Sequence, residues 1–168
     1  EVTYTEWDGT TDLSAGNYYL TGDIAHSDNA IFAEGNVNLC LNGYTMERSI
    51  SVQESAVLNI CDCGGNGKIT IDANVINYNK SNAAVSLYSG SLIGTSDGNT
   101  VIDGDNASNS KFYLYGGTVS HTGANIPLAT NRGEIYLYGG TVTGSNNHGV
   151  IAAANGKIYL CGDTVINP

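Results

Sequence analysis

The sequence predicts an all-β fold, a single-stranded right-handed parallel β-helix of about six to seven rungs with an N-terminal cap. The main observation is a repeat, because residues 112–119 return in nearly the same letters at 135–142 and again at 158–165. Within each copy apolar and polar residues alternate, which is typical of a strand with one buried face. A Gly-Gly pair follows the alternation in two of the copies, and glycine favours the bend of a coil corner.

The repeat extends toward the N-terminus, so further rungs can be aligned. Apolar residues occupy the first and third positions of every rung, in the pairs Val37/Leu39, Leu58/Ile60, Val85/Leu87, Phe112/Leu114, Ile135/Leu137 and Ile158/Leu160. After the glycine bend the next apolar residues are Val119, Val142 and Val165, which predict a second strand. A third apolar stretch precedes the rungs, at 31–32, 50–52, 128–129 and 150–153. Each coil therefore has three short strands, and neighbouring coils must stack to bury their apolar faces.

One domain is expected, because no linker-like segment divides the chain. Residues 1–24 are predicted to form an N-terminal cap and the first strand, with Trp7 and Leu13 over the first open rung. Residues 25–168 are predicted to form the β-helix rungs. The chain begins without Met and ends directly after a strand-like segment, so we expect a fragment of a larger protein. The other domains of that protein are then expected as partners of this one.

The charge of the chain argues against several classes of partner. The sequence has 6 Lys and Arg against 16 Asp and Glu, a formal net charge of -10, which repels a nucleic-acid backbone or an anionic membrane. No apolar run approaches the roughly 20 residues that membrane insertion requires. The basic residues are scattered along the sequence, so no basic cluster for an acidic polysaccharide is expected; they are Arg48, Lys68, Lys80, Lys111, Arg132 and Lys157.

Outward-facing tyrosines are the candidate ligand-binding residues. They form two columns on one outer face, Tyr113, Tyr136 and Tyr159 in the first and Tyr88, Tyr115 and Tyr138 in the second. Aromatic faces at strand spacing could lie against successive sugar rings, with the phenol hydroxyls hydrogen-bonded to glycan hydroxyls. Alternatively, identical residues in register stack on one another and only stabilise neighbouring rungs. The sequence leaves both interpretations open.

The cysteines offer a disulfide. Cys40 and Cys61 occupy the same position in adjacent rungs, at a separation compatible with a bridge, and Cys63 competes for Cys40. Cys161 is several rungs away from the first pair. Either one bridge at Cys40 or none is therefore expected. The spacing of these cysteines, without a neighbouring His, does not match a zinc site.

Carboxylates are the residues that sugar hydrolysis or calcium binding would need. The densest group is Asp97, Asp103 and Asp105, whose spacing does not match a calcium-binding hand and whose Gly neighbours are typical of turns. We expect no cofactor, with calcium at this loop as the alternative. No nucleophile with a matching base can be recognised, so no catalytic residues are predicted and the chain is expected not to be an enzyme.

The segments 14–24, 38–45 and 58–65, together with the Tyr-Gly-Gly-Thr-Val rungs, resemble a known family. They are similar to right-handed parallel β-helix modules of secreted or cell-wall-attached, adhesin-like proteins of Gram-positive gut bacteria, related to the carbohydrate-binding and sugar-hydrolysis type of β-helix. The resemblance covers nearly the whole chain. It implies an extracellular, secreted or wall-attached location and a polysaccharide or a host-surface glycan as partner.

The function expected from these observations is non-catalytic binding of a glycan or a surface through the tyrosine columns. A structural spacer or stalk segment of a cell-surface protein is the alternative. A fragment of a polysaccharide-degrading enzyme is the third interpretation, and it is disfavoured because 168 residues leave little room for the long loops that build a cleft.

Overall fold

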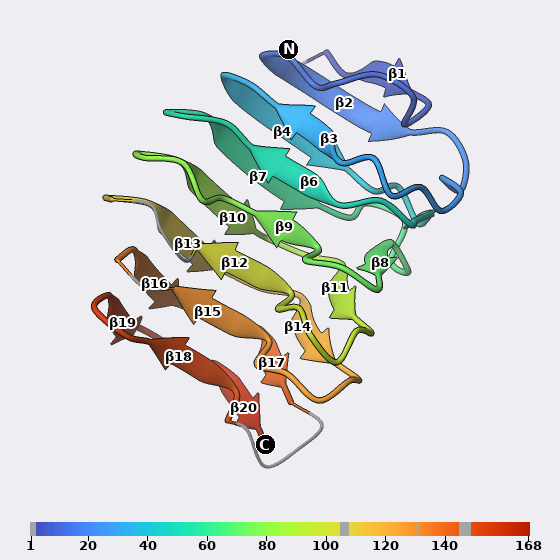
Figure 1. Ribbon diagram of the computed structural model, residues 1–168. Helices are drawn as coiled ribbons and strands as arrows, with labels where there is room; N and C mark the ends of the chain where they lie inside the picture. The colour runs from blue at the N-terminus through green and yellow to red at the C-terminus, as the bar shows by residue number, and fades with distance from the viewer. Residues whose placement is uncertain (1–2, 105–107, 131, 145–148) are drawn as a thin grey trace.

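The structure, a computed structural model, describes residues 3–104, 108–130, 132–144 and 149–168. Within these residues every regular element is a β-strand, and the strands form three parallel sheets that run the length of the molecule (Figure 1). This confirms the predicted all-β parallel solenoid. The described part of the chain contains no helix of the length and hydrophobicity needed to cross a membrane.

From β3 on, the chain visits the three sheets in a fixed order, so each of these turns adds one strand to each sheet, and β1 and β2 add two further strands to the first sheet. The first sheet has the order β1 (Thr5–Trp7), β2 (Gly16–Leu20), β4 (Asn36–Cys40), β7 (Val57–Cys61), β10 (Ala84–Leu87), β13 (Lys111–Leu114), β16 (Glu134–Leu137) and β19 (Lys157–Leu160). The second has β5 (Thr45–Met46), β8 (Lys68–Ile71), β11 (Ser91–Gly94), β14 (Thr118–His121), β17 (Thr141–Thr143) and β20 (Val165–Asn167). The third has β3 (Ile31–Ala33), β6 (Ile50–Val52), β9 (Ile76–Asn77), β12 (Ile102–Gly104), β15 (Leu128–Thr130) and β18 (Ile151–Ala153).

The strand register confirms the rung alignment read from the sequence. The first apolar position pairs from turn to turn, in the series Val37, Leu58, Val85, Phe112, Ile135 and Ile158. All of these side chains except Ile158 are fully buried. The core is therefore a set of apolar columns shared by neighbouring turns, which is why a single turn could not be stable alone.

The glycine bends set the register between the first and second sheets. Gly117 and Gly140 both have φ of 76°, a left-handed conformation that residues with a Cβ rarely adopt. In the last turn Asp163 stands in this place, and its φ is not positive. The corner takes one more residue, so Ile166 rather than Val165 pairs with Val142. The sequence-based alignment of Val165 with Val142 was therefore wrong by one residue.

The N-terminal residues contribute strands as well as covering the core. Strand β1 pairs in parallel with β2, and β2 pairs in parallel with β4, so both belong to the first sheet. Trp7 is buried, and its indole N–H donates a hydrogen bond to the carbonyl of Thr11 at 3.1 Å. Leu13 is also buried and bridges to Ala33 in the third sheet. The region expected to be a cap thus continues the parallel stacking.

The last turn leaves apolar side chains exposed. Leu160 is 70% exposed and Ile166 is 41% exposed, although Leu137 and Val142, their counterparts in the preceding turn, are buried. No later turn of the described chain packs on them. This end of the solenoid therefore presents strand edges and apolar side chains together.

Candidate functional site

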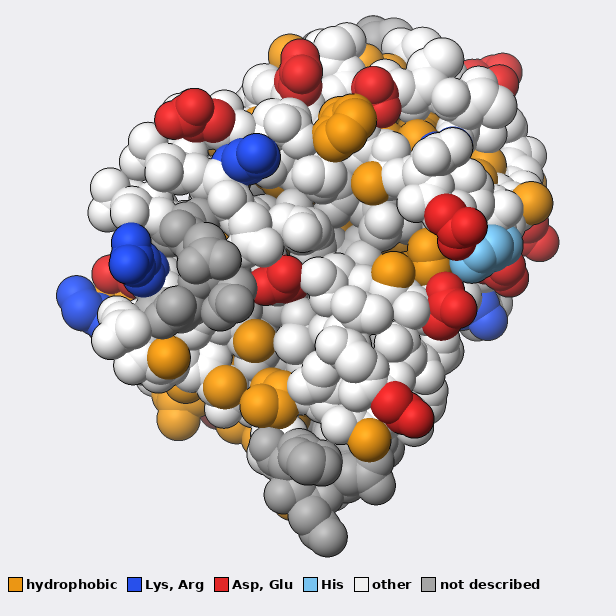
Figure 2. Space-filling model, in the orientation of Figure 1, with side chains coloured by type: hydrophobic (Ala, Val, Ile, Leu, Met, Phe, Trp, Pro, Cys, Tyr) orange, Lys and Arg blue, Asp and Glu red, His pale blue; other side chains and the backbone are white. Residues whose placement is uncertain are grey.

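The predicted tyrosines all project from one surface, which we call the tyrosine face and define as Tyr88, Tyr113, Tyr115, Tyr136, Tyr138 and Tyr159. They lie on or directly after β10, β13, β16 and β19 of the first sheet. Their outward direction follows from strand alternation, since the residues on either side of Tyr113 and Tyr136 are buried. By contrast, Figure 2 shows that uncharged polar side chains and backbone dominate the surface over the third sheet.

The rings stack on one another within each column. In the first column the ring centroids are 5.0 Å apart between Tyr113 and Tyr136 and 4.6 Å apart between Tyr136 and Tyr159. In the second column they are 4.9 Å apart between Tyr88 and Tyr115 and 5.0 Å apart between Tyr115 and Tyr138. All four ring pairs are nearly parallel, with interplanar angles of 10° to 20°.

This stacking limits how a sugar can bind. Tyr115 and Tyr136 each lie between two other rings, so both of their faces are covered. The interior of the tyrosine face therefore offers ring edges and hydroxyls to solvent. The expected contact between sugar rings and successive aromatic faces is available only at the ends of the columns.

Tyr88 has the open ring face at the N-terminal end of its column. Among the described residues its ring stacks on Tyr115 alone, and its side chain is 50% exposed. It lines a hollow of about 190 Å³ together with Tyr4, Asn38 and Asn59. This volume is below the roughly 300–1,000 Å³ of pockets for drug-sized ligands, so the hollow suits one small ring. An aromatic face beside amide groups is a suitable arrangement for a sugar.

The two asparagines belong to a column of stacked amides that the sequence analysis missed. The Asn38 amide donates to Oδ1 of Asn17 at 2.7 Å, and the Asn59 amide donates to Oδ1 of Asn38 at 2.9 Å. The same column continues through Ser86 to Tyr113, because the strands stay in register. The signal was the recurrence of Asn at one rung position. Asn59 ends the series beside Tyr88 and leaves its Oδ1 without a donor among the described residues.

A carboxylate holds the C-terminal end of the first tyrosine column. Glu134 accepts a hydrogen bond from the Tyr136 hydroxyl at 2.7 Å and a longer one from Tyr159 at 3.4 Å. Its oxygens lie 3.8 Å from Nζ of Lys111 and 3.7 Å from Nζ of Lys157. The Tyr136 hydrogen bond and then the two lysines hold the pKa of Glu134 below its ordinary value of 4.5.

Three phenols of the tyrosine face, those of Tyr115, Tyr136 and Tyr138, have raised pKa values and are protonated at neutral pH. Donation to the Glu134 carboxylate raises the pKa of Tyr136 above its usual value of 10.0. Partial burial by the stacked neighbours raises the pKa of Tyr115 and of Tyr138. A protonated phenol can donate as well as accept a hydrogen bond, and among these three the proton of Tyr136 is already donated to Glu134.

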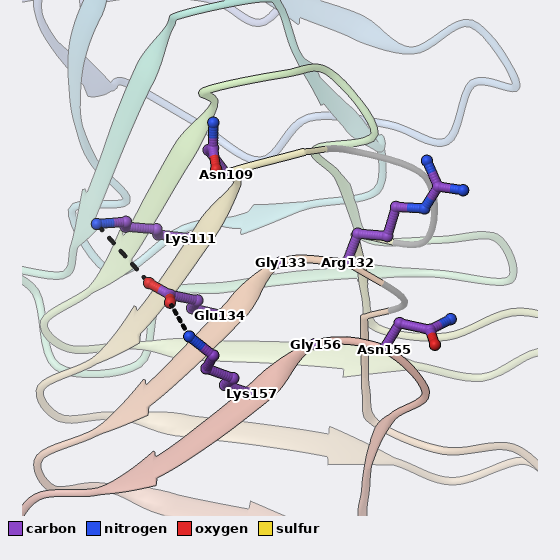
Figure 3. A pocket seen from close by; sticks show the side chains of 8 residues that line it. All are labelled: Asn109, Lys111, Arg132, Gly133, Glu134, Asn155, Gly156 and Lys157. Carbon is purple, nitrogen blue, oxygen red and sulfur yellow. Dashed lines mark ion pairs between the residues drawn. The ribbon is translucent and has the colours of Figure 1, made fainter.

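Three basic side chains gather in a hollow of about 410 Å³ next to the tyrosine face, at Lys111, Arg132 and Lys157. Figure 3 shows Lys111, Glu134 and Lys157 in one row, with Arg132 on the other side of the Gly133 backbone. The sequence analysis expected scattered basic residues, and for these three that was wrong. Lys111 and Lys157 occupy one rung position with Glu134 between them, which the repeat already implied, whereas Arg132 comes from the preceding corner.

The cysteines form a cluster with one bridge. Cys40 is bonded to Cys63, the second of the two expected partners, with Cα atoms 6.4 Å apart. The turn after β7 curves back over Cys40 because the Asp62 carboxylate accepts hydrogen bonds from Gly43 and Gly67, at 2.7 Å and 2.8 Å. Cys61 remains a thiol, and burial followed by the charge of Asp62 raises its pKa.

The three sulfur atoms of Cys40, Cys61 and Cys63 lie within 4.8 Å of one another, close enough to share a metal ion. Sequence spacing hid this group, because Cys40 comes from the preceding turn. While the bridge is formed only Cys61 keeps a thiol, and a disulfide does not supply thiolate ligands.

Two of the three aspartates considered for calcium accept hydrogen bonds from protein donors. Asp103 on β12 accepts hydrogen bonds from the amides of Asn74 and Asn79, at 2.8 Å and 3.1 Å. Asp97 accepts one from the backbone N–H of Ala124 at 2.9 Å. Asp105 lies outside the described residues. In the described ranges no group of three metal-ligating side chains includes Asp97 or Asp103, so the calcium site stays a prediction.

Comparison with known proteins gives no assignment. No protein-family model matches the chain, and no significant match exists among curated proteins or among solved structures. The fold and the site therefore define a class only, a parallel β-solenoid with a stacked tyrosine face on one sheet.

Proposed function

We propose that this chain is a non-catalytic, adhesin-like β-solenoid module that binds glycans outside the cell through the tyrosine face. The observation that carries the proposal is the Tyr88 ring face on which no other described ring stacks, which lies beside the amides of Asn38 and Asn59 at the end of a row of tyrosines. A sugar ring stacks on Tyr88, and its hydroxyls bond to the amides. Neighbouring sugars then extend over the edges of Tyr115 and Tyr138 and bond to their hydroxyls.

The tyrosine face is matched to an extended ligand. Tyr88 and Tyr159 lie three strands apart in the first sheet, which corresponds to about 14 Å along the solenoid axis. The rings are held rigidly by their neighbours, so little side-chain freedom is lost when a ligand binds. A polymer of repeating sugars suits a surface whose own groups repeat at a constant spacing.

The extracellular, secreted or wall-attached location rests on two supports. The Cys40–Cys63 bridge is typical of proteins in oxidising compartments and is rare in the cytosol. The resemblance of the repeat motifs to wall-attached modules of Gram-positive gut bacteria agrees with this location. Free-thiol counting on protein prepared from its native source tests it, since a fully reduced Cys40 and Cys63 would contradict the oxidising compartment.

A structural spacer is the second candidate, and the covered ring faces favour it. Tyr115 and Tyr136 each stack on two rings of their own column, in the turns before and after, so their side chains already contribute to holding successive turns together. In that case the tyrosine face needs no ligand.

A glycan array distinguishes the two functions. Wild-type protein is compared with Tyr88→Ala, with the double variant Tyr115→Phe/Tyr138→Phe, and with Phe32→Ala, which removes an exposed aromatic side chain from the third sheet. We expect Tyr88→Ala to weaken glycan binding roughly twofold to tenfold, the value of one aromatic stacking contact. The Phe32 variant should bind like the wild type. Absence of binding by the wild type, or equal binding by all variants, leaves the spacer as the function.

A reducing-sugar assay tests the non-catalytic part of the proposal. Any glycan retained on the array is incubated with the wild-type protein at several pH values. Release of reducing ends above the background of the buffer would place the chain among glycan-degrading enzymes.

A further inference from the structure

We propose that the basic hollow beside the tyrosine face binds the anionic group of an acidic sugar, a carboxylate or a sulfate. This inference rests on the proposed function for the rest of the glycan, and it names the class of sugar that the surface selects. Three of the 6 Lys and Arg residues of the chain line this one hollow, in a protein whose net charge is -10.

The charges in the hollow do not cancel. Three cations, Lys111, Arg132 and Lys157, and one carboxylate, Glu134, line the hollow, which gives it a formal charge of +2. Glu134 is paired with the two lysines, and Arg132 lies on the far side of Gly133 from it (Figure 3). Both lysine–carboxylate distances, 3.8 Å and 3.7 Å, are longer than a hydrogen bond. Each ammonium carries three donors, so both lysines keep donors for a ligand.

Glu134 holds the two lysines in place. It accepts a hydrogen bond from Tyr136, so its carboxylate is fixed from the side of the tyrosine face. Lys111 also lies 6.0 Å from the centre of the Tyr136 ring. The lysines are therefore positioned before a ligand arrives, and the cost of ordering them on binding is reduced.

Glycine backbone forms the floor of the hollow. Gly133 and Gly156 lie between the lysine row and Arg132 (Figure 3), and a Cβ on Gly156 would clash with the carbonyl oxygen of Gly133. The two turns therefore approach closely here, and the hollow is lined by backbone between the cations. Because the hollow adjoins Tyr136, a glycan lying on the tyrosine face brings its sugars to these cations.

The test uses an oligosaccharide of neutral sugars that ends in one galacturonate, and the methyl ester of the same compound, which has no charge. We expect the wild type to bind the acid more tightly than the ester. Lys111→Gln, Arg132→Gln and Lys157→Gln should each weaken binding of the acid by roughly twofold to fivefold, the range for a partly exposed ion pair, and leave the ester unaffected. Lys80→Gln, an exposed lysine outside the hollow, is the control of equal charge change and should behave like the wild type.

A second arm separates the hollow from the rest of the glycan site. Amide NMR signals of Gly133 and Gly156 are followed during titration with galacturonate, with galactose 6-sulfate and with galactose. We expect shifts with the two acids only, and the lower Kd fitted from the concentration dependence of the shifts identifies carboxylate or sulfate as the preferred group.

Each outcome decides the inference. Equal binding of acid and ester overturns it while the glycan-binding function stands. If neither oligosaccharide binds but the acids shift the Gly133 and Gly156 signals, the anion site stands and the glycan-binding function fails. If neither acid shifts these signals, or Lys80→Gln weakens binding as much as the hollow variants, the inference is wrong.

Discussion

Tyr115→Ala should reduce the stability of the fold more than Tyr88→Ala does, whereas Tyr88→Ala should reduce glycan binding more than Tyr115→Ala does. Tyr115 has stacked rings on both faces, at 4.9 Å and 5.0 Å, whereas Tyr88 has one stacked ring and one open face. Tyr115→Ala therefore removes two stacking contacts within the column and a longer one, at 6.0 Å, with Tyr113, whereas Tyr88→Ala removes one. If the tyrosine face also binds glycans as proposed, Tyr88→Ala removes the ring of that face that lies beside the asparagines.

The size of the stability difference follows from the number of contacts. An aromatic pair contributes about 0.5–1.5 kcal/mol beyond the burial of its area. We expect Tyr115→Ala to lower the free energy of unfolding by about 2 kcal/mol and Tyr88→Ala by about 1 kcal/mol. For a chain of this size each kcal/mol corresponds to a fall in Tm of roughly 2–4 °C.

Urea unfolding and glycan titration measured on the same protein samples test this order. Tyr115→Phe is the control, because it keeps the stack and removes only the hydroxyl. Equal losses of stability for Tyr115→Ala and Tyr88→Ala would show that the stacking contacts do not stabilise the turns. A larger loss of binding for Tyr115→Ala than for Tyr88→Ala would refute the assignment of the sugar to the open face of Tyr88.

Three further measurements probe the bridge, the carboxylate and the exposed end. Because the Cys40–Cys63 bridge closes a sequence separation of 23 residues, its reduction should cost about 3 kcal/mol in urea unfolding, with an unchanged midpoint contradicting this. Because folding lowers the pKa of Glu134, its ionised form stabilises the fold above pH 4.5, and this contribution is lost as the pH falls through the pKa of the folded state. The difference in Tm between the wild type and Glu134→Gln should therefore disappear in acid. A difference in Tm that stays constant with pH would contradict this linkage. Leu160→Lys should reduce concentration-dependent association in sedimentation velocity, since Leu160 is 70% exposed at an open strand edge, and unchanged association would place the contact elsewhere.

The fold could be predicted from the sequence because every turn of the solenoid has to bury apolar residues at the same rung positions. The apolar pair at each rung, such as Ile135 and Leu137, must face inward for the turns to stack, and this requirement is written into the spacing of the repeat. The prediction of the strand register was less reliable in the last turn, where the sequence departs from the repeat. Asp163 replaces a left-handed glycine, and the register at Val165 moved by one residue.

The site was predicted less completely, because side-chain direction and corner geometry are not encoded by rung position. The tyrosine columns were visible in the repeat, but the rotamers that cover the faces of Tyr115 are not. The choice between Cys61 and Cys63 depended on the turn that Asp62 holds in place. Arg132 joins the lysines only because the corner before β16 brings it beside them.

The charge distribution narrows the proposed ligand further. A net charge of -10 opposes any polyanion, and the hollow offsets this only where a ligand group contacts its cations. The screening length is about 10 Å at 0.1 M salt, so acidic side chains farther away act weakly on a single bound carboxylate but act together on a dense polymer. A mostly neutral glycan with isolated acidic sugars therefore gains the local attraction without the summed repulsion. Moderate salt should accordingly improve the binding of a densely sulfated polymer relative to that of the singly charged oligosaccharide.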